Sequence, residues 1–212
     1  MGKIFGYDSG IMRFLNKLVD CVFLSVLWIV FSIPIFTFGA SSTALYYTAN
    51  KVIRRDRSHV WREFWGAFKT NFKQATIVWL FFMVFYWILG MNCIWMYQWQ
   101  QKALLIFYAV FGVFITVWAI YLFALIARFE NKTKVIMKNA GLMAVRHIIY
   151  SFILILMFVL AVIVSLMWWV LILILPAIYG VLASSLLEPV FRKYMSEEDL
   201  EAEDERNRDY YN

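Results

Sequence analysis

Long apolar stretches alternate with short clusters of Lys and Arg along this chain, and that alternation most constrains its fold. Three stretches, Leu18–Phe38, Ala75–Tyr97 and Ala103–Ala127, are long enough to cross a hydrocarbon core about 30 Å thick. A fourth, Ile148–Leu187, carries no charge and is long enough for two crossings. With 63% hydrophobic and 16% charged residues, the chain has too little polar surface for a soluble globule. We therefore predict an all-α, polytopic transmembrane helix bundle.

The basic clusters fix how the chain threads through the membrane. Lys and Arg next to spans are retained in the cytoplasm, and two such clusters flank the first apolar stretch, one ending at Lys17 and one spanning Lys51–Lys73. The chain must therefore cross twice between them. Pro34 interrupts the first helix, and a short helix of about 21 Å over residues 40–53 would return. The candidate hinge residues are Pro34, Thr37 and Gly39.

This threading predicts about six spans, arranged as three hairpins, with both termini in the cytoplasm; five spans is the alternative count. The spans lie near residues 18–38, 40–53, 75–97, 103–127, 148–166 and 170–187. Nineteen of the 20 Lys and Arg residues then face the cytoplasm of a bacterial cell, Lys102 being the exception. The first apolar run is longer than the 7–15 residues of a signal-peptide core, so we interpret it as a membrane anchor.

The segment 58–74 is predicted to form an amphipathic helix in the membrane interface. At about 100° per residue, its aromatic side chains share one face and its basic side chains the other. The same pattern fits a docking helix that presents its exposed face to a cytoplasmic partner. The candidate partner residues are Trp61, Phe64, Trp65, Phe68, Lys69, Asn71, Phe72 and Lys73.

Two further segments lie outside the predicted spans. In the second basic loop, residues 128–147, Thr133 is placed to begin a helix that runs through Val145. The acidic cytoplasmic tail, residues 196–212, holds eight acids and two Arg. Such a composition is typical of a solvated, largely disordered tail or a frayed helix. The alternative is a tail that contacts the basic loops.

Ionisable groups are nearly absent from the predicted spans. Asp20 and Glu188 lie near span ends, and we expect each to pair with basic neighbours, Asp20 with Lys17 and Glu188 with Arg192 and Lys193. The lack of a charge near the midplane argues against an ion-coupled carrier, because such carriers place acids there. No metal-ligand spacing, nucleotide-binding loop or nucleophile–base pair occurs, so we predict no catalytic residues, cofactor or metal, and no enzyme activity.

Several sequence blocks resemble the YesL family, bacterial membrane proteins classed as a domain of unknown function. The carrying blocks are Ile33–Ala40, Thr43–Tyr47, Phe64 with Phe68–Thr76, and more weakly Arg128–Glu130 and Lys138–Ala140. The resemblance implies a genomic context, since members are often encoded beside carbohydrate importers of the ATP-binding-cassette (ABC) type. It carries no catalytic residues to transfer.

The leading hypothesis is therefore a non-catalytic accessory subunit that binds the lipid bilayer and the permease subunits of an ABC carbohydrate importer. No nucleic-acid partner is expected. Permeases of such importers bind the ATPase through a cytoplasmic helix with an acidic residue at a fixed spacing. The nearest match here, Lys138–Gly141, lacks both the acid and the spacing, so direct contact with the importer's ATPase is not expected either. The alternative is a permease-like transporter of neutral solutes such as sugars, with Trp28, Trp79 and Trp118 as stacking platforms.

Overall fold

The computed structural model describes residues 10–56 and 58–211 and is helical, with no strand in those residues. Lys3 and Arg57, which the threading assigns to the cytoplasm, and the last tail residue, Asn212, lie outside the described residues. The α-helices are α1 (Gly10–Ser32), α2 (Phe38–Thr48), α3 (Val60–Gln98), α4 (Lys102–Arg128), α5 (Thr133–Arg146), α6 (Ile148–Met167), α7 (Leu175–Arg192) and α8 (Glu197–Tyr211). Short 3₁₀ segments lie at η1 (Ile35–Thr37) and η3 (Trp169–Leu173), and a π-helical segment at η2 (Ala49–Arg54).

Four helices in the described part of the chain are long and apolar enough to cross a membrane: α1, α3, α4 and α6. The helices at the other two predicted spans do not meet this description. Helix α2 has only 11 residues, and α7 contains Glu188 and Arg192. The helical membrane character of the prediction is therefore supported, whereas six crossings remain a prediction.

The chain reverses direction at Pro34, as the sequence indicates. Helix α1 ends at Ser32 because the residue before a proline is disfavoured in the α conformation, and Pro34 is extended. The Thr37 hydroxyl is within 2.5 Å of the Phe31 carbonyl oxygen and 2.6 Å of that of Pro34. The indole N–H of Trp79 donates to the Ile35 carbonyl at 2.7 Å. Thr37 and Trp79 thus hold the reversal in place.

Gly39 acts by close packing rather than as a hinge. It lies in the first turn of α2, and no described glycine has a positive φ. A Cβ at this position would lie 2.6 Å from the Cβ of Trp79 and 2.7 Å from the carbonyl oxygen of Ala75. Only glycine therefore lets α2 approach the backbone of α3 this closely.

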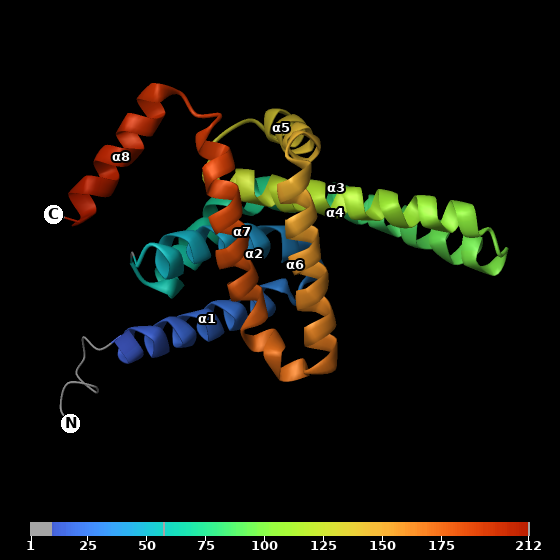
Figure 1. Ribbon diagram of the computed structural model, residues 1–212, viewed down its shortest axis with the longest axis horizontal. Coiled ribbons are helices and arrows are strands. Elements are labelled where there is room, and N and C mark those ends of the chain that lie inside the picture. The colour runs from blue at the N-terminus through green and yellow to red at the C-terminus, as the bar shows by residue number, and fades with distance from the viewer. Residues whose placement is uncertain (1–9, 57, 212) are drawn as a thin grey trace.

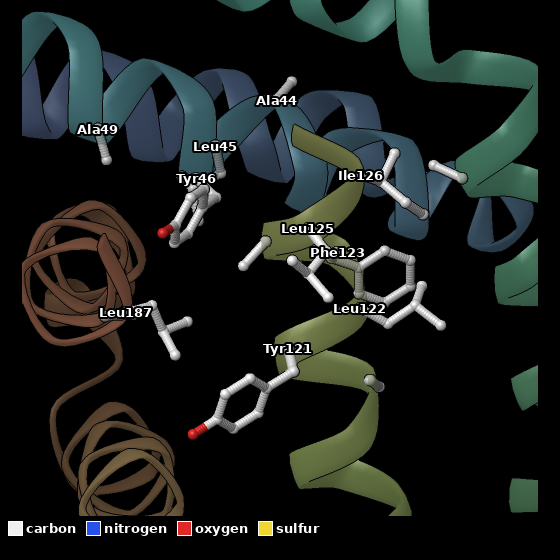
Figure 2. Close-up of a cluster of buried hydrophobic side chains, with 14 of the residues drawn as sticks. Ala44, Leu45, Tyr46, Ala49, Tyr121, Leu122, Phe123, Leu125, Ile126 and Leu187 are labelled. Carbon is white, nitrogen blue, oxygen red and sulfur yellow. The ribbon is translucent and has the colours of Figure 1, made fainter. Parts of the chain in front are cut away.

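Helix α2 is the most enclosed helix of the fold. Eight of its 11 residues are buried, in contact with α1, α3, α4 and α7. Figure 2 shows Leu45 and Tyr46 facing the buried side chains of α4, with Leu187 of α7 on the same side. The small residues that the sequence places here, including Ser41 and Thr43, are fully buried, which fits their role in close helix packing.

Helix α3 joins two segments that the sequence analysis treated separately. The predicted interfacial helix 58–74 and the span 75–97 form one uninterrupted helix of 39 residues. A straight helix of that length is about 58 Å long, roughly twice the thickness of the hydrocarbon core. The first half therefore continues the direction of the span, and the expectation of a separate helix lying flat in the interface is not met.

The hairpins do not lie side by side as one parallel bundle. Helices α3 and α4 form a long hairpin that extends away from the core, and α6 and α7 run across its direction (Figure 1). The packed region is where these two hairpins and the α1–α2 pair meet. Charged ends of several helices converge near this region, and they form the site described next.

Candidate functional site

The aromatic face of the predicted docking helix is largely used inside the chain. Phe64 is fully buried and Phe68 is 7% exposed. Both pack against Phe31 at the end of α1, with ring centroids 5.5 and 5.0 Å apart. Trp65 is half-buried against the same ring. The face therefore anchors α3 to α1, and only Trp61 (50% exposed) and Phe72 (36%) remain open.

The polar candidates on this helix do not converge on a site. The ammonium group of Lys69 lies over the Trp65 ring, 4.7 Å from its centroid. The Asn71 side chain donates to the carbonyl of Ala67 one turn earlier, at 3.0 Å, and Lys73 is exposed. This segment presents a basic surface, and none of its candidate residues lines the cavity described below.

The three tryptophans suggested as sugar platforms are engaged in separate structural contacts. Trp28 donates to the Ser42 hydroxyl at 3.2 Å and Trp118 to the Met137 carbonyl at 3.0 Å, while Trp79 holds the Pro34 reversal. None of the three lines the cavity described below.

A buried carboxylate on α7, that of Glu188, is the centre of the candidate site. Glu188 is only 2% exposed. Its Oε1 accepts hydrogen bonds from the Asn50 amide at 2.9 Å and the Tyr46 hydroxyl at 3.3 Å. Figure 2 shows the Tyr46 hydroxyl pointing toward α7. These neutral donors satisfy one side of a carboxylate that burial would otherwise destabilise.

Two arginines satisfy the other oxygen of Glu188. Its Oε2 lies 3.3 Å from a guanidinium nitrogen of Arg55, which follows η2, and 3.5 Å from one of Arg128, the last residue of α4. The prediction that Glu188 is paired at the end of α7 holds. Its expected partners do not, because Arg192 pairs with Asp204 instead.

The acidic tail supplies the fourth charge. Glu203 of α8 is 6% exposed and forms ion pairs with Arg55, at 3.4 Å, and with Arg128. A second contact joins Asp204 to Arg192 at 2.9 Å. The tail is therefore a helix, as one of the two expectations for it allowed, and most of its described residues are exposed, but it also contacts basic residues at two points. The reason is that two arginines, brought together by tertiary packing, bind one of its carboxylates.

Arg55, Glu188, Arg128 and Glu203 together form a closed ring of alternating charge, which we call the ionic ring. Each member comes from a different element, namely the end of η2, α7, the end of α4, and α8. The ring therefore ties the ends of three returning helical segments to the tail. Buried ion pairs of this kind contribute to stability only when all partners are present.

The pKa of Glu203 reflects this environment. Burial by itself would raise the pKa of the carboxyl, because it disfavours the charged form. The nearby guanidinium of Arg128, with Arg55 and Arg192, outweighs burial, so the pKa lies below its ordinary value. Glu203 is consequently ionised at neutral pH.

A cavity of about 580 Å³ opens beside the ionic ring. Its walls come from α2 and η2, from the segment after α4, from α7 and from the tail. Three cations line it, Lys51, Arg55 and Arg128, together with the carboxylates of Glu130, Glu188, Asp199 and Glu203. The volume is typical of a small-molecule site, and the charged side chains among its walls suit a charged or hydroxylated ligand.

Sequence reasoning found Glu188 but missed the other members of the ring. Arg55 and Arg128 were recognised only as topological signals, and Glu203 only as one of several acids. One signal was available, namely that both arginines directly end helices of the apolar bundle. Predicting that these two arginines lie together would still have required knowing which hairpins are neighbours.

The histidine and cysteine side chains do not form a metal site in the described residues. No group of three or more His, Cys, Asp or Glu side chains there is placed to hold a metal ion. His147 shares a hydrogen bond with the Tyr194 hydroxyl at 2.8 Å. Cys21 is buried and Cys93 half-buried, and neither forms a disulfide.

Comparison with known proteins gives one match. A family model described as "Protein of unknown function, DUF624" matches residues 21–93, roughly a third of the chain. No curated protein and no solved structure matches. The matched segment contains the Pro34 reversal, α2, Arg55 and most of α3, and it excludes Arg128, Glu188 and Glu203. Over that segment the chain is similar to a family whose function is unknown.

Proposed function

We propose that this protein is a non-enzymatic accessory subunit that packs laterally against the permease of an ABC-type carbohydrate importer in the bacterial cytoplasmic membrane. The choice of importer comes from the resemblance of its sequence blocks to the YesL family. The accessory role is supported by one structural observation, the unpartnered outer part of the α3–α4 hairpin. We call residues 83–114 the arm.

The arm extends beyond the packed region (Figure 1), and Leu89 is its only buried residue. Its surface is apolar and aromatic, with Trp87 73% and Ile106 64% exposed. The amide of Asn92 is satisfied within its own helix by the Ile88 carbonyl. The arm therefore offers two helix faces to lipid or to another membrane protein.

Two glycines on the arm indicate close helix contact. A Cβ added at Gly90 or Gly112 would meet nothing within 4 Å, whereas Gly39 is used inside the fold. Glycine in a helix interior costs about 1 kcal/mol relative to alanine. In membrane helices, small residues allow a neighbouring backbone to approach closely. A permease helix packed against Gly90 or Gly112 accounts for these residues.

The proposed threading places the basic connections in the cytoplasm, with α2 and α7 as shielded returning helices in a six-pass chain. Its support is that Lys17 pairs with Asp56 at 3.0 Å, so the start of α1 lies beside the end of the return. The ionic ring likewise brings the ends of η2, α4 and α7 together.

In a background without Cys21 and Cys93, a cysteine at position 100 should react with an impermeant reagent in intact cells. A cysteine at position 134 should not, and labelling there would overturn the threading.

Copurification tests the accessory role. The tagged protein, extracted in mild detergent from cells that express the importer, should recover its permease subunits, identified by mass spectrometry. Gly90→Leu and Gly112→Leu should abolish recovery while leaving the protein folded. Gly66→Leu is the matched control, because Gly66 is equally open but lies outside the arm. Recovery without any importer subunit, or equal recovery by all variants, would contradict the proposal.

Transport by the chain itself is tested separately. Purified protein in liposomes should give no flux of labelled neutral sugar, because the candidate tryptophans are engaged in structural contacts. Sugar flux above that of empty liposomes would favour the transporter alternative instead.

A further inference from the structure

The two acids of the ionic ring are held very differently. Glu188 lies within α7, is 2% exposed and accepts additional hydrogen bonds from Tyr46 and Asn50. Glu203 lies on α8, and its ion-pair partners among the described residues are Arg55 and Arg128. Glu188 is therefore a fixed part of the site, whereas Glu203 is the member that can leave.

Apart from Glu203, the described side chains of α8 make few contacts with the rest of the fold. Glu203 is the buried residue among positions 197–205, and the helix lies at the periphery of the fold (Figure 1). Its remaining ion pair, Asp204 with Arg192, is 47% and 39% exposed. Exposed pairs of this kind contribute only about 0–1 kcal/mol. The tail thus docks chiefly by inserting one carboxylate between two guanidinium groups.

Departure of Glu203 changes the charge of the cavity. Asp199 leaves with it, since both are on α8, and Lys51, Arg55 and Arg128 then face Glu188 and the exposed Glu130. Lys51 is oriented by Glu63, at 2.8 Å, and by the Tyr47 hydroxyl, at 3.2 Å. Loss of these two carboxylates leaves Arg55 and Arg128 with Glu188 as their one remaining acidic partner among the described residues, and it leaves room for more than a carboxylate.

We propose that Arg55 and Arg128 form a phosphate-binding site that the Glu203 carboxylate occupies in cis. Guanidinium groups bind phosphate with charge-assisted hydrogen bonds, and their planar donors match its oxygens. A phosphate monoester or diester carries more oxygen acceptors than a carboxylate and extends into the remaining cavity. Binding of phosphate releases α8, so the tail reports occupancy of the site.

Two sources can supply this phosphate. Arg55 and Arg128 end the segments η2 and α4, where apolar sequence gives way to basic loops, the level expected for lipid headgroups. The headgroup of phosphatidylglycerol is one source, and a soluble phosphate monoester is the other. The inference does not depend on the importer association, because it concerns only the ring and its cavity.

The test uses full-length protein and measures binding and tail position together. Nitroxide labels at positions 62 and 205, both exposed, report whether α8 is docked, in a background without the native cysteines. The probes are inorganic phosphate and glycerol 3-phosphate in detergent, and nanodiscs of phosphatidylglycerol against phosphatidylcholine. Sulfate-free chloride buffers of matched ionic strength serve as the reference.

We expect Glu203→Gln to bind phosphate at least tenfold more tightly than the native chain, because the competing carboxylate is gone. Glu201→Gln is the matched control, since it removes the same charge from an exposed position of the same helix, and should bind like the native chain. Arg128→Lys and Arg55→Lys keep the charge and should still lose at least tenfold in affinity. If Arg128→Lys fails to fold, Arg55→Lys carries the same test.

The probes distinguish the sources. Release of α8 by soluble phosphate or glycerol 3-phosphate supports a soluble ligand. Release in nanodiscs of either lipid, but not by the soluble probes, supports a lipid headgroup, and release in phosphatidylglycerol alone shows that the net negative charge of the headgroup is needed. If neither releases α8, or if Glu203→Gln binds no more tightly than Glu201→Gln, the proposal is wrong. Phosphate affinity that is unchanged in the lysine variants would also overturn it.

Discussion

The chain joins its helices in two physically different ways, at the neutral contact of Gly39 and at the charged ionic ring. At Gly39, α2 meets α3 with backbone and Trp79 atoms closer than any added Cβ could tolerate. At the ring, four charged side chains meet across elements that need not touch closely. The first contact depends on shape alone, and the second depends on charge and therefore on pH, salt and competing ions.

This difference separates a permanent joint from a reversible one. Close packing between small residues has no competitor in solution, because no solute replaces a helix backbone. A carboxylate between two arginines has many competitors, since any anion satisfies the same donors. We therefore expect the region around α2 to be constant and the tail to be the part of the molecule that changes state.

The largest effect is expected from removing the fixed acid of the ring. Glu188→Ala leaves the partly buried Arg55 and Arg128 with less compensation, and loss of one partner of a buried pair costs up to about 3–5 kcal/mol. The free energy of unfolding, measured by denaturation with SDS in mixed micelles, should fall by that amount. Glu201→Ala, at an exposed position, should change it by less than about 0.5 kcal/mol. Equal losses in both variants would show that the ring does not hold the helices.

The neutral contact is tested by adding one methyl group. Gly39→Ala should lower the free energy of unfolding by about 1–3 kcal/mol, because overpacking forces the backbone of α2 away from α3. Gly66→Ala is the matched control in α3, where a Cβ meets nothing within 4 Å, and should be neutral or stabilising by up to about 1 kcal/mol. The Gly39 loss should not vary with pH, whereas effects at the ring should change as the pH falls below about 4.3.

Acidification should release the tail while leaving α2 in place. The pKa of Glu203 is lowered in the folded chain, so its contribution to docking is full above the ordinary Glu value of about 4.3. That contribution is lost as pH falls through the folded pKa, which lies below 4.3. The charges facing this carboxyl are Arg55, Arg128, Arg192 and Glu188.

The same nitroxide pair at positions 62 and 205 measures this release. Between pH 7 and 5 the distance should stay constant, and it should lengthen as the pH falls further. In Glu203→Gln the tail should already be undocked at pH 7, with no pH-dependent step. A native chain whose tail stays docked below pH 3 would show that Glu203 is not what holds it.

The smallest change in the free energy of unfolding is expected at the exposed ion pair that joins α1 to the segment after η2. Lys17 and Asp56 lie 3.0 Å apart, with side chains 42% and 68% exposed. Lys17→Ala should cost less than about 1 kcal/mol, and the loss should disappear at 1 M salt. A larger, salt-independent loss would assign this pair a role comparable to that of the ring.

Local features of the fold were predictable where they depend on neighbouring residues. The break at Pro34 follows from steric exclusion of the α conformation before proline, and the apolar stretches follow from their length. The helix predicted from Thr133 through Val145 is present as α5, Thr133–Arg146. The continuity of α3 was not predicted, because its aromatic face was assigned to lipid rather than to Phe31. Nothing in the segment 58–74 itself distinguishes these two apolar environments.

The sequence by itself determined that the chain is helical, apolar enough for a membrane, and reversed at Pro34, because these properties arise from residues within a few turns of one another. Only the tertiary structure decided that Gly39 meets Trp79, that the hairpins cross, and that Arg55 and Arg128 enclose Glu188 and Glu203. These contacts join segments far apart in the chain, and their partners are selected by the packing of whole helices. A tail carboxylate binds where that packing has already placed two guanidinium groups together.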